Sequence, residues 1–140
     1  MIRRREFFTL VGGAAAWPTV ARAQRHAGRM RRIGVLIALT ENDPEGQLYL
    51  GAFRQGLQNL GWAEGRNIQI DYRWPGGNAE RLRVASRELM EPRPELVIAG
   101  TTTSLRALQQ EQVSLPIVFA QVADPLAREY VPSIARPGGN

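Results

Sequence analysis

Short apolar runs alternate with amphipathic stretches from Arg32 onward. Three of the runs are continuous and bounded by turn residues, which is typical of strands buried on both faces of a parallel sheet. A fourth run alternates apolar and polar residues, as a half-buried strand does. We therefore expect four strands, at residues 32–39, 68–74, 96–100 and 116–120.

Helix signals fill the intervals between these strands. Asp43-Pro44-Glu45 is a helix-opening sequence, and Asn78 and Thr101 to Ser104 can cap two further helices. The apolar faces expected for the three helices are Leu50, Phe53, Leu57 and Leu60, ending at Gly61; Leu82, Ala85, Ser86 and Leu89; and Leu105, Ala107 and Leu108. A last helical pattern, residues 127–135, contains Pro132. The alternation predicts right-handed crossovers and an α/β fold, a doubly wound parallel sheet with strand order 2-1-3-4.

The first 23 residues have the three parts of an export signal. Arg3, Arg4 and Arg5 form a basic start, residues 9–20 are modestly apolar, and Ala21-Arg22-Ala23 is a small-x-small cleavage site. The apolar part is too short to span a bilayer as a helix. Paired arginines followed by x-Phe-Phe resemble the twin-arginine signal. The prediction is a soluble periplasmic protein, with a flexible lead-in at residues 24–31 and a lobe at 32–140; a basic amphipathic helix in a cytoplasmic protein is the alternative.

The positive charge belongs to this leader. Residues 1–32 hold eight Arg and one Glu, a balance of +7, whereas residues 33–140 hold ten Arg against twelve acids, a balance of −2. A nucleic-acid-binding domain needs a basic face of its own. We therefore expect no nucleic-acid partner.

The residue inventory removes most catalytic chemistry. The chain has no Cys and no Lys, and its single His is His26 in the leader. Thiol nucleophiles, lipid anchoring through Cys, His-based triads and P-loops are thereby excluded. The junction at residues 39–44 has no Gly, so the dinucleotide fingerprint fails as well. We expect no catalytic residue, no cofactor and no metal, although an enzyme on a Rossmann-like sheet is kept as an alternative.

Short polar side chains gather where the predicted strands end. An open α/β sheet binds ligands at the carboxyl ends of its strands, and helix N-termini there favour anionic groups. The candidate ligand-binding residues are Thr40, Asn42, Thr101, Thr102, Gln121 and Asp124. Capping and turn formation would explain the same residues without a ligand. We interpret Trp62, Tyr72 and Trp74 as packing residues rather than as a stacking platform.

Several long motifs resemble one family. They are the leader Arg3-Arg-Arg-Glu-Phe-Phe, the strand Arg32-Ile-Gly-Val-Leu, the stretch Phe53 to Asn67, Ile70 to Trp74, Pro116 to Pro125 and Ala135 to Asn140. The chain is similar to periplasmic substrate-binding proteins of ABC transporters, in the group of tryptophan- and tyrosine-binding components. The resemblance implies one lobe of a type I periplasmic-binding fold, with the loops after the first, third and fourth strands facing a small ligand. It implies solute capture for an ABC importer without chemistry, and it carries over the six candidate residues.

Members of that family are longer than this chain, which stops within Pro137-Gly-Gly-Asn140. We therefore expect a fragment or a truncated reading frame that supplies the N-terminal lobe. An ABC permease would be a partner only if the second lobe exists. A truncated, non-binding fragment remains the alternative to a functional binder.

Overall fold

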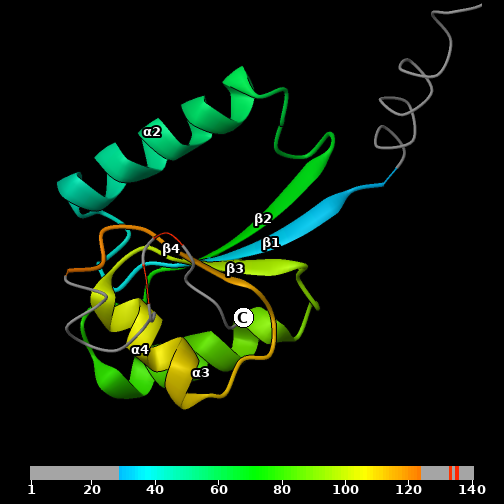
Figure 1. The fold of residues 1–140 in the computed structure, drawn as a ribbon. Helices are drawn as coiled ribbons and strands as arrows, with labels where there is room; N and C mark the ends of the chain where they lie inside the picture. Colours follow the sequence, from blue (N-terminus) through cyan, green and yellow to red (C-terminus); the bar gives the residue numbers. More distant parts are fainter. Residues whose placement is uncertain (1–28, 124–132, 134, 136–140) are drawn as a thin grey trace, which may run out of the picture.

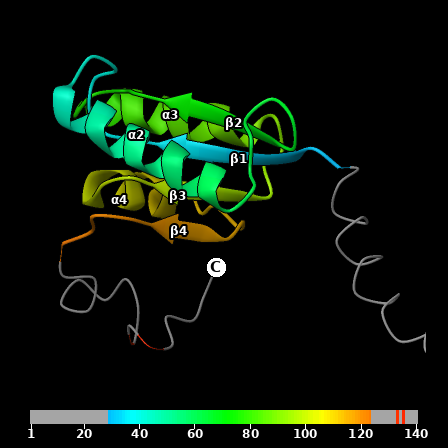
Figure 2. The same cartoon turned by 90° about the horizontal axis from the view of Figure 1, so that it is seen from above.

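The computed structural model describes residues 29–123, 133 and 135. Its sheet contains four parallel strands, β1 (Arg31–Leu36), β2 (Ile68–Arg73), β3 (Leu96–Ala99) and β4 (Ile117–Phe119). The strands lie side by side in the order β2-β1-β3-β4 (Figures 1 and 2). The predicted strand order and parallel direction are confirmed, and the opening strand lies in the interior of the sheet.

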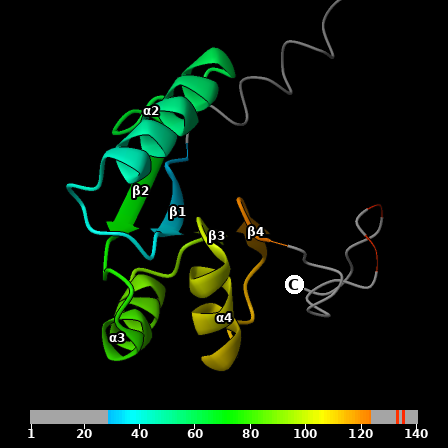
Figure 3. The same cartoon turned by 90° about the vertical axis from the view of Figure 1, so that its left-hand side faces the viewer.

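Three helices connect these strands and cover both faces. Helix α2 (Pro44–Asn59) lies on one side of the sheet, whereas α3 (Ala79–Met90) and α4 (Thr102–Gln110) lie on the other (Figure 3). This placement confirms the doubly wound α/β fold. It also follows from right-handed crossovers, because the step from β1 to β2 runs in the opposite direction to the steps from β2 to β3 and from β3 to β4.

Each helix begins at the capping residue that the sequence indicates. Asp43 Oδ1 accepts hydrogen bonds from the backbone N–H groups of Glu45 at 2.9 Å and Gly46 at 3.1 Å. Asn78 caps α3 and Thr101 caps α4 in the same manner. Gly61 follows the end of α2 with φ 85°, a left-handed conformation that costs Gly little. Local polar chemistry therefore fixes where the helices start and stop.

Two apolar clusters form the core, one on each face of the sheet. The strand residues alternate between them, as the period of two requires. The cluster on the α2 face is built on Ile33, Val35, Ile37, Ile68 and Ile70, with Phe53 and Leu57 packed against it. The cluster on the α3–α4 face contains Leu36, Leu82, Ala85, Leu89, Val97, Ala99, Leu105 and Leu108. Both predicted faces of α3 and α4 are buried.

One predicted core residue is exposed. Leu60 was expected on the buried stripe of α2, but its side chain is 78% exposed. The helix ends at Asn59, and Leu60 is the C-cap residue with φ −91° and ψ 5°. Because the chain leaves helical geometry there, the helical spacing no longer places Leu60 on the stripe. The predicted helix at 127–135 and the leader lie outside the described residues, apart from positions 133 and 135.

The α2 face is covered unevenly. Ile117 and Phe119 pack against the cluster on the α3–α4 face, so the intervening Val118 points to the α2 side. Its side chain remains 50% exposed. Among the described elements, α2 is the one on this side of the sheet, and it packs on the cluster formed chiefly by β1 and β2 (Figure 3). Among the described residues, no helix covers the α2 side of β4.

Candidate functional site

The four strands end level with one another. Leu36 of β1 pairs with Arg73 of β2 and with Ala99 of β3, and Ala99 pairs with Phe119 of β4. Backbone pairing continues for one residue, since Gly100 N–H donates to Leu36 O at 2.9 Å and Ala120 N–H donates to Ala99 O at 2.9 Å. All four following loops therefore start at one edge of the sheet. The structure brings five of the six candidate residues to this edge.

Thr40 and Asn42 belong to a tight turn between β1 and α2. The turn is closed by a hydrogen bond from Asp43 N–H to Thr40 O at 3.0 Å, which leaves Asn42 at a central position. Both side chains are exposed. A Cβ atom on Gly76 would lie 3.7 Å from Thr40 Cγ2, so this side chain lies beside the loop that follows β2. The two residues stand at the N-terminus of α2, as predicted.

Thr101 and Thr102 stand at the N-terminus of α4. Thr101 Oγ1 accepts from Ser104 N–H at 3.1 Å and lies 2.9 Å from Ser104 Oγ, so it caps the helix. Thr102 Oγ1 accepts from the backbone N–H of Ala123 at 3.0 Å. Both hydroxyls are thus engaged in local structure. The second bond fastens the loop after β4 to the start of α4.

Gln121 adopts an unusual backbone conformation at the end of β4. Its φ is +52°, in the left-handed region that few non-glycine residues occupy. Such conformations persist where the surrounding structure enforces them, and they cluster at functional sites. The side chain is exposed at the strand-end edge. Asp124, the sixth candidate, lies outside the described residues.

Tyr49 is a member of this site that the sequence did not indicate. It is partly buried on α2, and its hydroxyl donates a hydrogen bond to the carboxylate of Glu45, one turn earlier. That bond, and after it burial, raises the pKa of Tyr49. The i, i+4 spacing of Glu45 and Tyr49 was a usable signal for this contact. Nothing local signals that Tyr49 and Gln121 line the same hollow.

A mostly apolar hollow of about 270 Å³ lies between α2 and residues of β1, β3 and the loop after β4. It is lined by Val35, Ile37, Tyr49, Leu50, Ala52, Phe53, Ile98, Gly100, Ala120 and Gln121. Because Gly100 has no side chain, its backbone can lie against the Ile37 side chain. A Cβ atom on Gly100 would lie 2.9 Å from Ile37 Cγ1. Tyr49 and Gln121 bring polar groups to this otherwise apolar lining.

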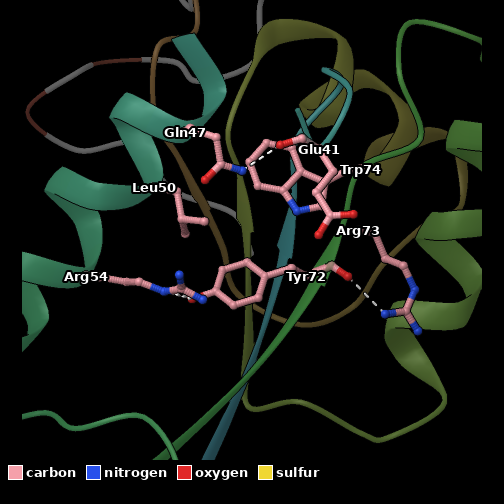
Figure 4. A pocket seen from close by; sticks show the side chains of 7 residues that line it. All are labelled: Glu41, Gln47, Leu50, Arg54, Tyr72, Arg73 and Trp74. Carbon is pink, nitrogen blue, oxygen red and sulfur yellow. Dashed lines mark hydrogen bonds between the residues drawn. The ribbon is translucent and has the colours of Figure 1, made fainter. Parts of the chain in front are cut away.

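A second hollow, of about 410 Å³, lies on the β2 side of α2 and is polar. Figure 4 shows the side chains that line it, which are Glu41, Gln47, Leu50, Arg54, Tyr72, Arg73 and Trp74. None of the six candidate residues is among them. Tyr72 and Trp74 pack against the core cluster on the α2 face, as expected, but they also form a wall of this hollow.

The cations of this second hollow are already paired. The Arg54 guanidinium lies 4.9 Å from the centre of the Tyr72 ring, and its Nε is 3.2 Å from Glu64 Oε2. Arg73 Nε is 3.0 Å from Glu88 Oε2. A hydrogen bond from Arg54 lowers the pKa of Tyr72, but burial raises it by more, so the net direction is upward. These interactions of Arg54 and Arg73 connect α2 and α3 to β2, so both guanidinium groups already have partners within the chain.

Within the described part of the chain, no group of three or more His, Cys, Asp or Glu side chains is arranged to hold a metal ion. None of its helices has the length and apolar character needed to cross a membrane.

Known proteins share both the sequence and the fold of this chain. A tyrosine-binding protein of Clostridioides difficile (strain R20291) is 27% identical over 88 residues, which cover 63% of this chain and 26% of that relative. A solved structure from Streptococcus pneumonia, an ABC domain in complex with L-Trp, is 25% identical with a TM-score of 0.70. It is matched over 79% of this chain and 37% of its own.

A ligand-free, open substrate-binding protein with adhesive properties from Clostridium difficile is 25% identical with a TM-score of 0.68, over 78% of this chain and 36% of that one. The chain thus spans little more than a third of each of these two solved structures and about a quarter of the tyrosine-binding relative. The family model for ABC transporter substrate binding proteins matches residues 33–140. The chain belongs to the family of ABC transporter substrate-binding proteins.

Proposed function

We propose that the chain is the N-terminal lobe of a periplasmic protein that captures an amino acid or a similar small carboxylate for an ABC importer, without chemistry. The observation that carries this proposal is the level ending of the four parallel strands. It gathers Thr40, Asn42, Thr101, Thr102 and Gln121 at one edge, together with the N-termini of α2 and α4.

The physical chemistry of that edge suits a carboxylate. Helix N-termini carry a partial positive charge that favours anions, each favourable contact contributing about 0.3–1 kcal/mol at an exposed position. Hydroxyl and amide side chains nearby can complete the hydrogen bonding of a small polar ligand. The L-Trp and tyrosine named for two relatives support an amino acid as the ligand. Asp124 stays a predicted contact.

The proposal includes a division of the chain. Residues 1–23 serve as a twin-arginine-like export signal, residues 24–31 as a flexible lead-in, and residues 32–140 as the lobe. The opposite wall of the cleft would come from the part of the longer relatives that this chain does not match. Binding to an ABC permease would need both lobes.

Calorimetric titration tests the binding proposal. We expect L-Trp or L-Tyr to bind the complete two-lobed protein, and tryptamine, which lacks the carboxylate, to bind at least about tenfold more weakly, since losing a contact to a charged group removes 1.5–3 kcal/mol. Failure of all amino acids and small carboxylates to bind would sink the proposal.

A non-binding fragment is the second candidate, and the exposed Val118 face favours it. The same titration on the 140-residue chain decides between the two. Measurable binding by the 140-residue chain excludes the hypothesis that it is a non-binding fragment, whereas binding only by a longer protein supports that hypothesis.

A further inference from the structure

The outer edge of β4 is open among the described residues. Backbone groups alternate along a strand between its two sides. At the ends of β4, Pro116 O accepts from β3 at 3.0 Å and Ala120 N–H donates to β3 at 2.9 Å. Ile117 and Phe119 therefore direct their N–H and C=O groups away from β3. None of these outward groups has a hydrogen-bond partner in the described part of the chain.

The opposite edge of the sheet, along β2, is partly blocked. Arg73 O accepts from Ile37 N–H at 3.1 Å, on the β1 side, so the carbonyl of Tyr72 faces outward. That carbonyl accepts from Arg73 Nη1 at 3.0 Å. Ile68 O, also on the outer side, accepts from Gly65 N–H at 2.8 Å. A strand arriving at β2 would meet occupied acceptors at both ends, which is not so at β4.

The side chains of β4 do not protect its edge either. Natural edge strands are commonly shielded by charged side chains. No charged residue occurs between Glu111 and Asp124, and residues 33–140 have a balance of only −2. Val118 is 50% exposed on the α2 side, where α2 packs over β1 and β2 instead (Figure 3). Two such edges could approach each other without repulsion between like charges.

The 140 residues leave little chain with which to cover this edge themselves. A parallel fifth strand would need a crossover of about a dozen residues or more, which reaches from Gln121 to about residue 133. Ser133 and Ala135 are described, and neither lies in a strand. The sequence then continues with Pro137-Gly-Gly139, and Pro and Gly are depleted in strands.

We propose that the β4 edge binds a second copy of the chain, with the two β4 strands antiparallel about a two-fold axis at Val118. In this register Ile117 of each copy lies opposite Phe119 of the other, as a hydrogen-bonded pair, so every outward N–H and C=O group is satisfied. Val118 lies opposite Val118 of the second copy on the α2 side. This is a non-hydrogen-bonded position, where facing side chains are closest. The pairing joins two four-stranded sheets into one and goes beyond the proposed function.

Sedimentation velocity of the 140-residue chain tests the association. We expect the wild-type chain to shift from monomer to dimer as its concentration rises. V118D and V118K should each raise the dissociation constant at least about tenfold, because two like charges then face each other across the axis. V84D changes a valine that is 44% exposed on α3 and should leave the association unchanged. A wild-type chain that stays monomeric at every concentration would overturn the proposal.

Mixing the two charged variants tests the two-fold register. V118D and V118K together should associate at least about tenfold more tightly than either variant alone, because opposite charges then meet at the axis. Circular dichroism shows whether both variants keep the fold. No gain on mixing two folded variants would overturn the pairing about Val118.

Amide hydrogen exchange of the wild-type chain tests the strand pairing without any substitution. We expect the protection of Ile117 and Phe119, whose N–H groups face outward, to rise with protein concentration. Val118 and Ala120, whose N–H groups face β3, should be protected at all concentrations. Dimers in which Ile117 and Phe119 gain no protection would overturn the strand pairing. Protection of these two amides that does not depend on concentration would also overturn it, because their partner would then lie within the same chain.

Discussion

Gly46 and Gly51 lie in the same helix, but their surroundings are opposite. Gly46 is buried where α2 meets the end of β2, and a Cβ atom there would lie 2.9 Å from Trp74 Cζ3 and 3.3 Å from Leu39 Cδ1. A Cβ atom on Gly51 would meet nothing within 4 Å. Gly46 therefore allows α2 to lie close to Trp74, whereas Gly51 makes no such contact and only weakens the helix.

Alanine at these two positions should therefore change stability in opposite directions. We expect G46A to lower the free energy of unfolding by about 1–3 kcal/mol, because the added methyl group displaces the Trp74 ring. G51A should raise it by about 0.5–1 kcal/mol, the ordinary advantage of Ala over Gly inside a helix. Urea unfolding followed by circular dichroism measures both. Stabilisation by G46A would show that α2 does not pack on Trp74 as described.

At the scale of the element, one contact between α4 and the loop after β4 is a hydrogen bond to a threonine hydroxyl, beside the apolar packing of Val122. Thr102 Oγ1 accepts from Ala123 N–H, while the next residue, Thr103, is exposed. The two threonines are adjacent in the first turn of α4. They form a matched pair for separating this contact from the general effect of replacing a threonine there.

We expect T102V to speed amide hydrogen exchange in the loop after β4. The amide of Ala123 loses its acceptor, so its hydrogen-exchange protection should fall, with a loss of about 0.5–1.5 kcal/mol in local stability. T103V should leave that protection unchanged. Equal protection of Ala123 in wild type and T102V would argue against the contact.

The elements themselves could be predicted because their signals are local. Asp43, Asn78 and Thr101 mark helix starts by short-range hydrogen bonds, and the alternation of strands with helices predicts the doubly wound parallel sheet. Leu60 was assigned wrongly because helical spacing does not tell where the helix ends. The hollow that Tyr49 and Gln121 line together was missed because it depends on how α2 packs over the sheet, which no short pattern encodes.

At the scale of the whole molecule, charge is distributed unevenly along the sequence. Residues 1–32 carry the excess of Arg, and the remainder is nearly neutral. Of the candidate site, the sequence could place five residues at one edge of the sheet, because parallel strands end together. It could not show whether their side chains are free, and the structure shows that the hydroxyls of Thr101 and Thr102 are engaged.

The proposed export route gives a prediction at this scale. Replacing Arg4 and Arg5 together by Lys should abolish appearance of the chain in the periplasm, because a twin-arginine signal requires the pair. Arg3→Lys keeps the same charge outside the pair and should leave export intact. Cell fractionation with immunodetection measures both. Undiminished export of the double variant would point to the general secretion route instead.

The interior position of β1 has a mechanical consequence. The proposed leader precedes β1 in the sequence, and β1 is hydrogen-bonded to β2 on one side and to β3 on the other. A force drawn through the leader along the strand axis therefore loads both ladders in shear, and β1 cannot peel away as an edge strand would. If the chain folded first, a translocase that threads unfolded chains would have to break the hydrogen bonds of β1 to β2 and to β3 at the same time. A translocase that carries folded proteins could pull on the leader while the sheet stays intact.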